Sequence, residues 1–568
     1  MNTIIEVANV HFKYPGATSY VLQGANFSIE QGEFTAVIGG NGSGKTTLFK
    51  TLNGLIPNYY TGEFSGEITV NGRAVSETTV SEMSHLVGYV YQDFENQLMR
   101  PTVLDDVAFA PLNFGDPSFR AKAEGALEAL GISHLRDQSI WQLSGGQKHL
   151  TAIAGVLALN PEILIIDEPA AQLDPHHARD IYMRLQRLQQ DYGKTIIVIE
   201  HHTEFIADFC SSVLLVDHGQ VLWKLPVKEG LLQIDDLTAR DIFPPQVTQA
   251  ALTKNKGDGS LLPTTIAEGD VYFRHRVHPP ASFLGSKNTD KTRADPPVVT
   301  MHGLSYTAKT MENDRNDILR HLSASFYPGE KIALVGTNGA GKTTLMKCFT
   351  GMVKPTNGTW DIRTDVVKKK SLEQLAKVVS YIFQNPEEMF IQDSIYNDLY
   401  FHHRSRGRSD DSFIQQLIQS FRLEEILDKD GRMLSGGQQR RASMAIGLAS
   451  EPLLLMLDEP TASLDVQSRK ELVQILQQMN TVDTVLIATH DMQLVAEWAT
   501  RVIVMDQGTF IFDGQPKEMF SNEHIWNQAG LIPPQIVQLG LALNMASPPL
   551  SVNEFTSWIK EEATHGIS

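Results

Sequence analysis

The feature that most constrains the fold is an internal repeat that spans nearly the whole chain. Three blocks each occur twice, in the same order: Gly-Gly-Asn-Gly-Ser-Gly-Lys-Thr-Thr at 39–47 and Gly-Thr-Asn-Gly-Ala-Gly-Lys-Thr-Thr at 336–344, Leu-Ser-Gly-Gly-Gln at 143–147 and 434–438, and Asp-Glu-Pro at 167–169 and 458–460. A repeat on this scale predicts two equivalent domains in one chain. A length of 568 residues accommodates both.

The repeat continues into an extension at the end of each unit. Pro-Pro-Gln occurs at 244–246 and again at 533–535. We therefore place the first domain at 1–254 and the second at 297–545, followed by a tail at 546–568.

Residues 255–296 have the composition of a linker, with several prolines, scattered Gly, Ser and Asn, and little periodic hydrophobicity. An alternative for 270–273 (Asp-Val-Tyr-Phe) is a short strand. A flexible tether of this length spans on the order of 35 Å. Such a tether favours pairing of the two domains within one chain.

Composition excludes several classes of protein. The formal net charge of −18 argues against a general nucleic-acid binder, because phosphate backbones require a basic surface. Cys210 and Cys348 are too few for a disulfide framework or a cysteine-based metal site. The pattern of residues 1–7 indicates a strand and not a signal peptide. The longest apolar runs, such as 453–457, are far short of the roughly 20 residues that span a bilayer, so any membrane part must come from other chains.

The pattern around each glycine-rich block is that of an α/β domain. Apolar strands at 34–38 and 332–335 run directly into the glycine loops, and helices are expected to follow at Thr46 and Thr343. After each Leu-Ser-Gly-Gly-Gln comes an apolar helical stretch, then a proline break, then a strand that ends at Asp-Glu. This alternation predicts an α/β fold.

The glycine-rich blocks have the spacing of a phosphate-binding loop, with a glycine, four residues, and then Gly-Lys-Thr. Their backbone N–H groups can close around phosphate oxygens, while Lys45 and Lys342 reach the β and γ phosphates. Thr46 and Thr343 are expected to ligate Mg²⁺. The sequence therefore predicts two sites for ATP with Mg²⁺.

An acidic pair follows each apolar strand of the third block. Asp167 and Asp458 would hold the magnesium ion through its water shell. The next residues, Glu168 and Glu459, are placed to accept a proton from an attacking water. Both units are therefore expected to hydrolyse ATP.

The Leu-Ser-Gly-Gly-Gln blocks, together with the elements above, resemble the signature of the ATP-binding cassette family over most of the chain. This resemblance implies two tandem P-loop cassettes, each with a RecA-like core, a helical signature subdomain and a C-terminal extension. It also implies a head-to-tail pair, in which the signature of one cassette completes the ATP site of the other. The ATP ligands implied are Tyr14, Gly39, Asn41, Gly42, Gly44, Lys45, Thr46, Thr47, Gly336, Asn338, Gly339, Gly341, Lys342, Thr343, Thr344, Ser144, Gly145, Gly146, Gln147, Ser435, Gly436, Gly437 and Gln438.

Further residues match the family by position. Gln92 and Gln384 are similar to its magnesium-sensing glutamine, which lies in a mobile loop. His201 and His490 match its switch histidine, which contacts the γ-phosphate; a structural histidine is the alternative. His202 is interpreted as incidental.

The first copy departs from the family pattern at two places. It has Ala-Ala-Gln-Leu-Asp at 170–174, where the second has Thr-Ala-Ser-Leu-Asp at 461–465. Glu200 also replaces Thr489 before the switch histidine. These differences are expected to slow or retune one site, although both general-base glutamates remain.

The two copies also differ at the aromatic residue that stacks on adenine in the family. Tyr14 fits this role in the first copy, whereas Ala308 stands opposite it in the second and Tyr306 aligns with Phe12. Core packing is the alternative for both tyrosines.

The segments Gln-Asp-Phe-Glu-Asn-Gln at 92–97 and Gln-Asn-Pro-Glu-Glu-Met at 384–389, with the Pro-Pro-Gln extensions, look like the energy-coupling-factor branch of importers. This resemblance implies a peripheral subunit at the cytoplasmic face of the cell membrane that energises vitamin or transition-metal uptake. Its implied partners are a membrane coupling subunit and a small substrate-binding membrane subunit. Glu95, Glu387 and Glu388 would dock basic side chains of the coupling subunit, with solvated loop carboxylates as the alternative.

Two other classes of protein share tandem cassettes. A soluble translation factor that acts on the ribosome carries a long, highly charged helical linker, unlike 255–296. A tandem sugar-importer ATPase usually has one degenerate cassette, whereas both copies here keep their motifs. The transported solute stays open, because this chain is not expected to touch it.

Overall fold

The computed structural model describes residues 2–170, 173–253, 262–277, 295–309, 315–363, 371–405, 411–462, 464, 466–478 and 482–559. The chain divides into two compact units, Met1–Gly269 and Asp270–Ser568. Each unit carries one copy of the repeat.

The first unit contains an antiparallel sheet with strand order β2-β1-β4-β5 and a mainly parallel sheet with strand order β10-β9-β3-β8-β7-β6. The strands are β1 (Thr3–Lys13), β2 (Leu22–Glu30), β3 (Phe34–Ile38), β4 (Glu63–Val70), β5 (Arg73–Ala74), β6 (Val87–Val90), β7 (Ile163–Asp167), β8 (Thr195–Ile199), β9 (Ser212–Asp217) and β10 (Gln220–Pro226).

The position of the site follows from the apolar strands of the parallel sheet. Every residue of β3, β7 and β8 is buried, as expected for strands covered on both faces. The chain leaves β3 through the glycine loop and enters α1 (Lys45–Leu52), which confirms the predicted strand and helix. Because parallel strands end at one edge, the residues that follow β3, β7 and β8 meet there.

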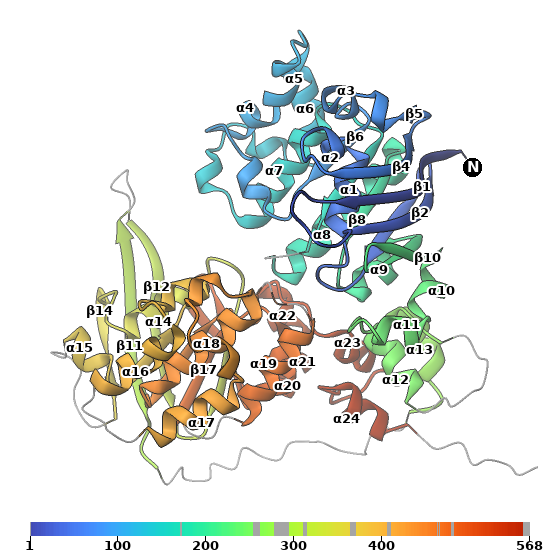
Figure 1. Ribbon diagram of the computed structural model, residues 1–568. Coiled ribbons are helices and arrows are strands. Elements are labelled where there is room, and N and C mark those ends of the chain that lie inside the picture. The colour runs from blue at the N-terminus through green and yellow to red at the C-terminus, as the bar shows by residue number, and fades with distance from the viewer. Residues whose placement is uncertain are drawn as a thin grey trace, which may run out of the picture. The chain divides into compact units, whose positions relative to one another are not determined.

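The remaining helices of the first unit include those of the signature subdomain and of the C-terminal extension. They are α2 (Leu55–Asn58), α3 (Val80–Met83), α4 (Val103–Val107), α5 (Phe109–Asn113), α6 (Phe119–Ala129), α7 (Gly145–Leu157), α8 (Pro175–Tyr192), α9 (Thr203–Phe209), α10 (Val227–Leu231), α11 (Ile234–Thr238) and α12 (Gln246–Leu252), and α13 (Ile266–Phe273) begins in the first unit and ends in the second. Figure 1 shows α4, α6 and α7 grouped on the side of this unit away from β1 and β2. Val103, Leu127 and Ile153 of these helices share one core with β3 and β7.

The second unit repeats this plan, with sheets of order β12-β11-β14 and β15-β16-β17-β13-β18-β19. The strands are β11 (Val299–Lys309), β12 (Arg315–Phe326), β13 (Lys331–Val335), β14 (Asn357–Ile362), β15 (Val379–Ile382), β16 (Leu454–Asp458), β17 (Thr484–Thr489), β18 (Arg501–Asp506) and β19 (Thr509–Gly514). The helices are α14 (Lys342–Phe349), α15 (Leu372–Leu375), α16 (Ile395–Ser405), α17 (Ser412–Ser420), α18 (Gly436–Ala449), α19 (Val466–Gln478), α20 (Met492–Trp498), α21 (Pro516–Ser521), α22 (Glu523–Gln528), α23 (Gln535–Ala542) and α24 (Val552–Ser557).

The segment predicted as a linker contains a helix. Residues 270–273 lie in α13, so the short strand considered for them is wrong. Within the second unit, Phe273 is buried against Phe555 of α24, with ring centroids 5.0 Å apart, and Val277 forms a bridge to Ile559. Residues 254–261, 278–294 and 560–568 lie outside the described part of the chain.

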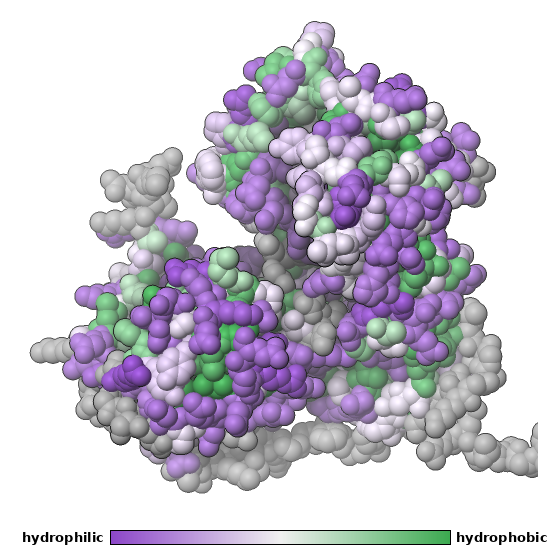
Figure 2. Space-filling view, viewed as in Figure 1, coloured by the Kyte–Doolittle hydropathy of each residue, from purple (hydrophilic) through white to green (hydrophobic). Residues whose placement is uncertain are grey.

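The surface of the protein and the hydropathy of its helices are those expected from the composition. Figure 2 shows hydrophilic side chains over much of the visible face, with hydrophobic ones gathered in smaller areas. Among the described helices, none is both long and apolar enough to cross a membrane.

Candidate nucleotide sites

Each glycine loop is closed by a contact that only glycine permits. A Cβ atom on Gly39 would lie 2.2 Å from the carbonyl oxygen of Val216, and one on Gly336 would lie 2.2 Å from that of Met505. Both strand-to-loop turns therefore require glycine, because the neighbouring strand passes too close for a side chain.

The lysine of each loop is buried and curls back over the loop. Lys45 Nζ donates to the carbonyl oxygens of Gly39 and Gly40, at 2.8 and 2.9 Å. Lys342 Nζ donates to Gly336 O at 2.6 Å. Burial lowers the pKa of Lys45, while Glu168 and Asp167 oppose this effect. The ammonium groups thus lie inside the cradle where an anionic phosphate would be held.

The threonine of each loop meets the aspartate of the third block. Thr46 Oγ1 donates to Asp167 Oδ2 at 3.3 Å, and Thr343 Oγ1 donates to Asp458 Oδ2 at 2.8 Å. Burial raises the pKa of both carboxyl groups. This pair of hard oxygen atoms fits Mg²⁺. In the part of the chain that the structure describes, no cluster of three or more His, Cys, Asp or Glu side chains could hold a metal.

A tyrosine supports each aspartate, and our sequence analysis did not assign it this role. Tyr89 donates its hydroxyl hydrogen to Asp167 Oδ2 at 3.1 Å, and Tyr381 donates to Asp458 Oδ2 at 2.7 Å. Each tyrosine lies three residues before the glutamine of the following loop, Gln92 or Gln384. This shared position in the two copies is the sequence signal from which the role of the tyrosines could have been predicted.

The two glutamates proposed as general bases share an unusual backbone conformation. The φ angles of Glu168 and Glu459 are 52° and 46°, in the left-handed region that non-glycine residues rarely adopt. Their backbone N–H groups donate to Ile199 O and Ala488 O of the adjacent strands, each at 2.9 Å. Strain of this kind tends to occur at functional sites, where the surrounding structure maintains it.

The side chain of Glu168 meets Gln92 and His201, which were predicted to be the mobile glutamine and the switch histidine. Gln92 Nε2 donates to Glu168 Oε2 at 2.7 Å. His201 Nε2 lies 3.3 Å from Glu168 Oε1. The structure therefore brings these three predicted residues together.

Glu459 has a different set of partners and is more deeply buried, with 8% of its side chain exposed against 24% for Glu168. Its Oε2 atom accepts from Thr489 Oγ1 at 3.1 Å and from the backbone N–H of His490 at 3.3 Å. His490 Nδ1 approaches its Oε1 atom to 2.9 Å without the alignment of a hydrogen bond. The net effect of burial and this carboxylate is a raised pKa for His490. Among the described contacts, none joins the exposed Gln384 side chain to Glu459.

Both signature blocks begin a helix through a capping box. Ser144 Oγ accepts from the backbone N–H of Gln147, whose Oε1 atom accepts from the Ser144 N–H at 2.9 Å. Ser435 and Gln438 form the same box at the start of α18. Each serine is exposed, so the capped helix start can reach a ligand.

The predicted adenine-stacking residue lies next to the phosphate loop. Tyr14 OH is 3.3 Å from Thr47 Oγ1, and its ring packs edge-on against Phe12. Tyr306 packs against the core of the second unit. Of the segments that differ between the copies, Ala171, Gln172, Ser463 and Asp465 lie outside the described residues.

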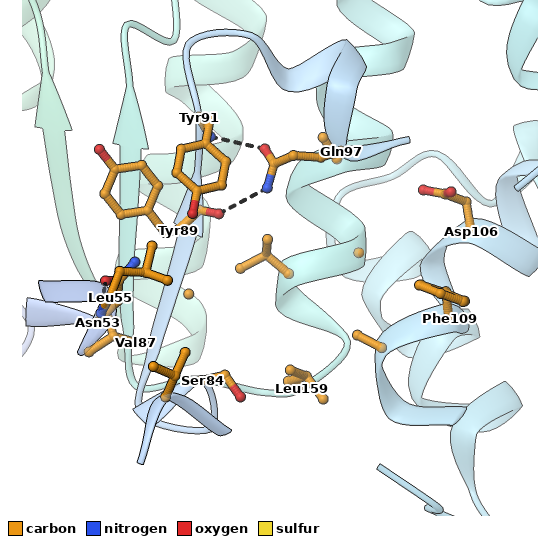
Figure 3. A pocket seen from close by; sticks show the side chains of 16 residues that line it. Asn53, Leu55, Ser84, Val87, Tyr89, Tyr91, Gln97, Asp106, Phe109 and Leu159 are labelled. Carbon is orange, nitrogen blue, oxygen red and sulfur yellow. Dashed lines mark hydrogen bonds between the residues drawn. The ribbon is translucent and has the colours of Figure 1, made fainter. Parts of the chain in front are cut away.

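A pocket of about 300 Å³ lies beside the loop that contains Gln92 in the first unit. Its walls include Tyr91, Gln97 and Phe109. Figure 3 shows the Gln97 amide bridging the backbones of Tyr91 and Tyr89, by bonds of 2.9 and 3.2 Å. This side chain fixes the end of β6, from which the glutamine loop departs.

The three acidic loop residues do not share one environment. Glu95 forms an ion pair with Lys148 of α7 at 2.9 Å. Glu387 and Glu388 are exposed, and among the described residues no ion pair engages them.

Two ATP-binding units with paired phosphate loops and signature helices define a class of nucleotide-hydrolysing protein. A family profile described as ABC transporter matches residues 22–171 and 319–462. The chain belongs to the ABC transporter family and is an ATPase.

Relatives extend this similarity over the whole length. An ABC transporter ATP-binding protein of Methanosarcina mazei is 31% identical, with 98% of each chain covered. YkoD of Bacillus subtilis, named as a candidate HMP/thiamine import ATP-binding protein, is 31% identical over 92% of this chain and 93% of its own. The archaeal ribosome recycling factor aABCE1 has a TM-score of 0.57 at 20% identity, covering 90% of this chain and 91% of that one. At that identity the likeness shows the fold alone.

Proposed function

We propose that this chain is the ATPase subunit of an energy-coupling-factor importer for a vitamin or a transition metal. The observation that carries the proposal is that both units keep a buried lysine, a Thr–Asp pair, a strained glutamate and a histidine within reach of that glutamate. Two intact sites favour this class over the tandem sugar importers, in which one cassette is usually degenerate. Whole-chain similarity to the relative named for HMP/thiamine import adds support.

In the proposed mechanism, each residue has one task. Lys45 and Lys342 bind the β and γ phosphates of ATP. Mg²⁺, held by the Thr–Asp pairs, would offset phosphate charge when bound. Glu168 and Glu459 take the proton of the attacking water. His201 and His490 orient the γ-phosphate, and Gln92 and Gln384 link the site to the membrane partner.

The signature helices complete the mechanism. We propose that Ser144 to Gln147 serve the ATP of the second cassette and that Ser435 to Gln438 serve the ATP of the first. Exposed, capped helix starts suit this task, because their N–H groups and dipole favour a γ-phosphate. The two cassettes of one chain then close on ATP and open after hydrolysis.

Coupling to the membrane would use the surface around the glutamine loops. The pocket beside Gln97 in the first unit offers an apolar recess, and Leu112 and Phe114 near α5 are 46% and 42% exposed. Glu387 and Glu388 offer uncompensated carboxylates to basic side chains of a coupling subunit, whereas Glu95 already has Lys148. The chain would work at the cytoplasmic face of the membrane, with the coupling subunit and a substrate-binding subunit.

A ribosome-associated translation factor is the second candidate, because aABCE1 shares the tandem fold. The two candidates differ in their partners. Affinity purification of the tagged chain from solubilised cells should recover integral membrane proteins. Recovery of ribosomes without membrane proteins would overturn the importer proposal.

The coupling surface can be tested in the same purification. Glu387→Ala with Glu388→Ala should lower recovery of membrane partners and transport, while ATP binding by the free chain is retained. A desolvated charge pair would cost about 2–5 kcal/mol and an exposed pair about 0–1 kcal/mol. Glu373→Ala with Glu523→Ala removes the same charge from exposed positions elsewhere in the unit and serves as the control. Unchanged transport in the first pair would exclude these carboxylates from coupling.

A further inference from the structure

The two switch loops hold one carboxylate each, on opposite sides of the histidine. In the first unit it precedes the histidine, as Glu200, and is 2% exposed. In the second it follows the histidine, as Asp491, and pairs with Arg469 at 2.8 Å. The position equivalent to Arg469 is Ala178. The two loops are therefore built differently around the same motif.

Glu200 binds the backbone of its own switch loop. Its Oε1 atom accepts from the N–H groups of His201 and His202, at 2.7 and 2.9 Å, and lies 2.7 Å from His202 Nδ1. Tyr182 OH donates to its Oε2 atom at 2.7 Å. With this set of donors, the Glu200 carboxylate is satisfied although it is buried.

Tyr182 is in turn fixed by aromatic packing. It is fully buried, and its ring stacks on Phe205 with centroids 5.0 Å apart and on Phe209 at 5.3 Å. The equivalent residue of the second unit is Val473, which has no hydroxyl group. Glu200 is thus held on a rigid support that the second unit lacks.

In the second unit the general base itself holds the loop. Thr489, which replaces Glu200, donates to Glu459 Oε2, and the same oxygen accepts from the His490 N–H. In the first unit Glu200 takes over the histidine N–H. Glu168 is then left with Gln92 and the ring of His201 as partners.

We propose that Glu200 is a positioning residue for ATP hydrolysis at the first site. By holding the backbone of the switch loop, it leaves the Glu168 carboxylate to pair with Gln92, so that the general base of this site responds to the mobile glutamine. Among the described contacts of the second site, no equivalent link between Gln384 and Glu459 occurs. This inference rests on the proposed role of Glu168 and Glu459 as general bases.

The test uses the full chain carrying Glu459→Gln, which silences the second site. In that background, Glu200→Thr should lower kcat at least about tenfold with little change in KM for ATP, because a displaced base slows chemistry more than it weakens binding. Glu200→Gln, which keeps the shape and loses the charge, should have a smaller effect. Converting the loop to the second type with Ala178→Arg, Glu200→Thr and His202→Asp should recover most of the lost kcat.

The link to the glutamine is tested by a double-mutant cycle. Gln92→Ala should slow the first site, and adding Glu200→Thr should cost little more than either change alone. Tyr182→Phe removes one hydrogen bond and keeps the ring, so it should act in the same direction as Glu200→Gln. Because this change is mild, it tests the inference even if the stronger variants misfold. An unchanged kcat for Glu200→Thr, or fully additive effects with Gln92→Ala, would overturn the inference. If Glu168→Gln in the same background retains turnover, the general-base assignment fails instead.

Discussion

The two units anchor the loop that contains Gln92 or Gln384 to the signature helix in different ways. In the first, His149 of α7 is fully buried and stacks on Phe94 of the loop, with ring centroids 4.2 Å apart and planes 6° apart. In the second, the equivalent Arg440 of α18 donates to the carbonyl oxygens of Phe383 and Gln384, at 3.1 and 2.8 Å. One loop is held by its side chain and the other by its backbone.

The chemical difference between His149 and Arg440 explains why Gln92 and Gln384 are restrained differently. Burial lowers the pKa of His149 to about 4, so the ring is neutral near pH 7 and serves as a flat packing surface. Burial lowers the pKa of Arg440 only to about 10, so it stays charged and binds carbonyl oxygens strongly. A backbone bond at Gln384 itself restrains that residue, whereas packing two residues beyond Gln92 leaves its side chain able to reach Glu168. Equivalent motifs therefore do not guarantee equivalent loops.

The largest expected effect tests whether both units are catalytic. Glu168→Gln and Glu459→Gln should each reduce turnover at their own site by about 10²–10⁴-fold, because the glutamine amide cannot accept the proton. ATPase and transport measured for each single variant in the assembled transporter provide the test. If one substitution changes neither, that site is not catalytic and the comparison reduces to one active and one inactive unit.

The next effect concerns the anchor of the second loop. Arg440→Ala should weaken local stability by about 1.5–3 kcal/mol, because two carbonyl oxygens lose a charged donor. Hydrogen exchange at the backbone amides of 383–385 in the full chain measures this opening. Arg432→Ala, at an exposed arginine of the same unit, is the control. Equal exchange in both variants would show that the backbone anchor contributes little.

The third prediction concerns the tyrosines that bind Asp167 and Asp458, and its effect should be equal in the two units. Tyr89→Phe and Tyr381→Phe each remove a hydrogen bond to the aspartate that we propose binds Mg²⁺. Loss of such supporting contacts typically weakens metal affinity about 10–100-fold. Titration of ATPase with Mg²⁺ should show a higher requirement for either variant, while Tyr192→Phe, at a half-exposed tyrosine, should behave like the parent. A shift for only one variant would extend the asymmetry to the metal site.

Sequence reasoning found the parts of the site that local pattern determines. The phosphate loops, the strands before them and the Asp-Glu pairs each combine a short motif with an apolar strand, and the structure contains β3, β13, β7 and β16 at these positions. The hydroxyl bonds of Tyr89 and Tyr381 were missed because their partners lie more than 70 residues away in sequence. The sequence showed only that Glu200 departs from the family pattern. It did not reveal that the Glu200 carboxylate binds the backbone of the switch loop, because nothing in the local pattern indicates that contact.

The helix α13 shows a different limit. Valine, tyrosine and phenylalanine at 271–273 favour a strand by propensity. A capping pattern begins upstream, where the Glu268 N–H donates to Thr265 Oγ1 at 3.3 Å, and the helix ends with Phe273 buried on Phe555. Thr-Ile-Ala-Glu at 265–268 was a visible signal for a helix start. The tertiary contact with the tail could not be read from the sequence.

The smallest expected effect concerns the ion pair that accompanies the His149 stack. Lys148 and Glu95 are 20% and 59% exposed, and such pairs contribute only about 0.2–1 kcal/mol because water and salt screen them. A double-mutant cycle with Lys148→Ala and Glu95→Ala, read by hydrogen exchange of the 93–97 loop at low and high salt, should give a coupling energy in this range that falls as salt rises. The cycle also bears on membrane coupling. If the pair is this weak, a basic partner side chain can displace Lys148, and Glu95 can still dock it; a coupling energy above about 2 kcal/mol would instead commit Glu95 to its own helix and leave docking to Glu387 and Glu388.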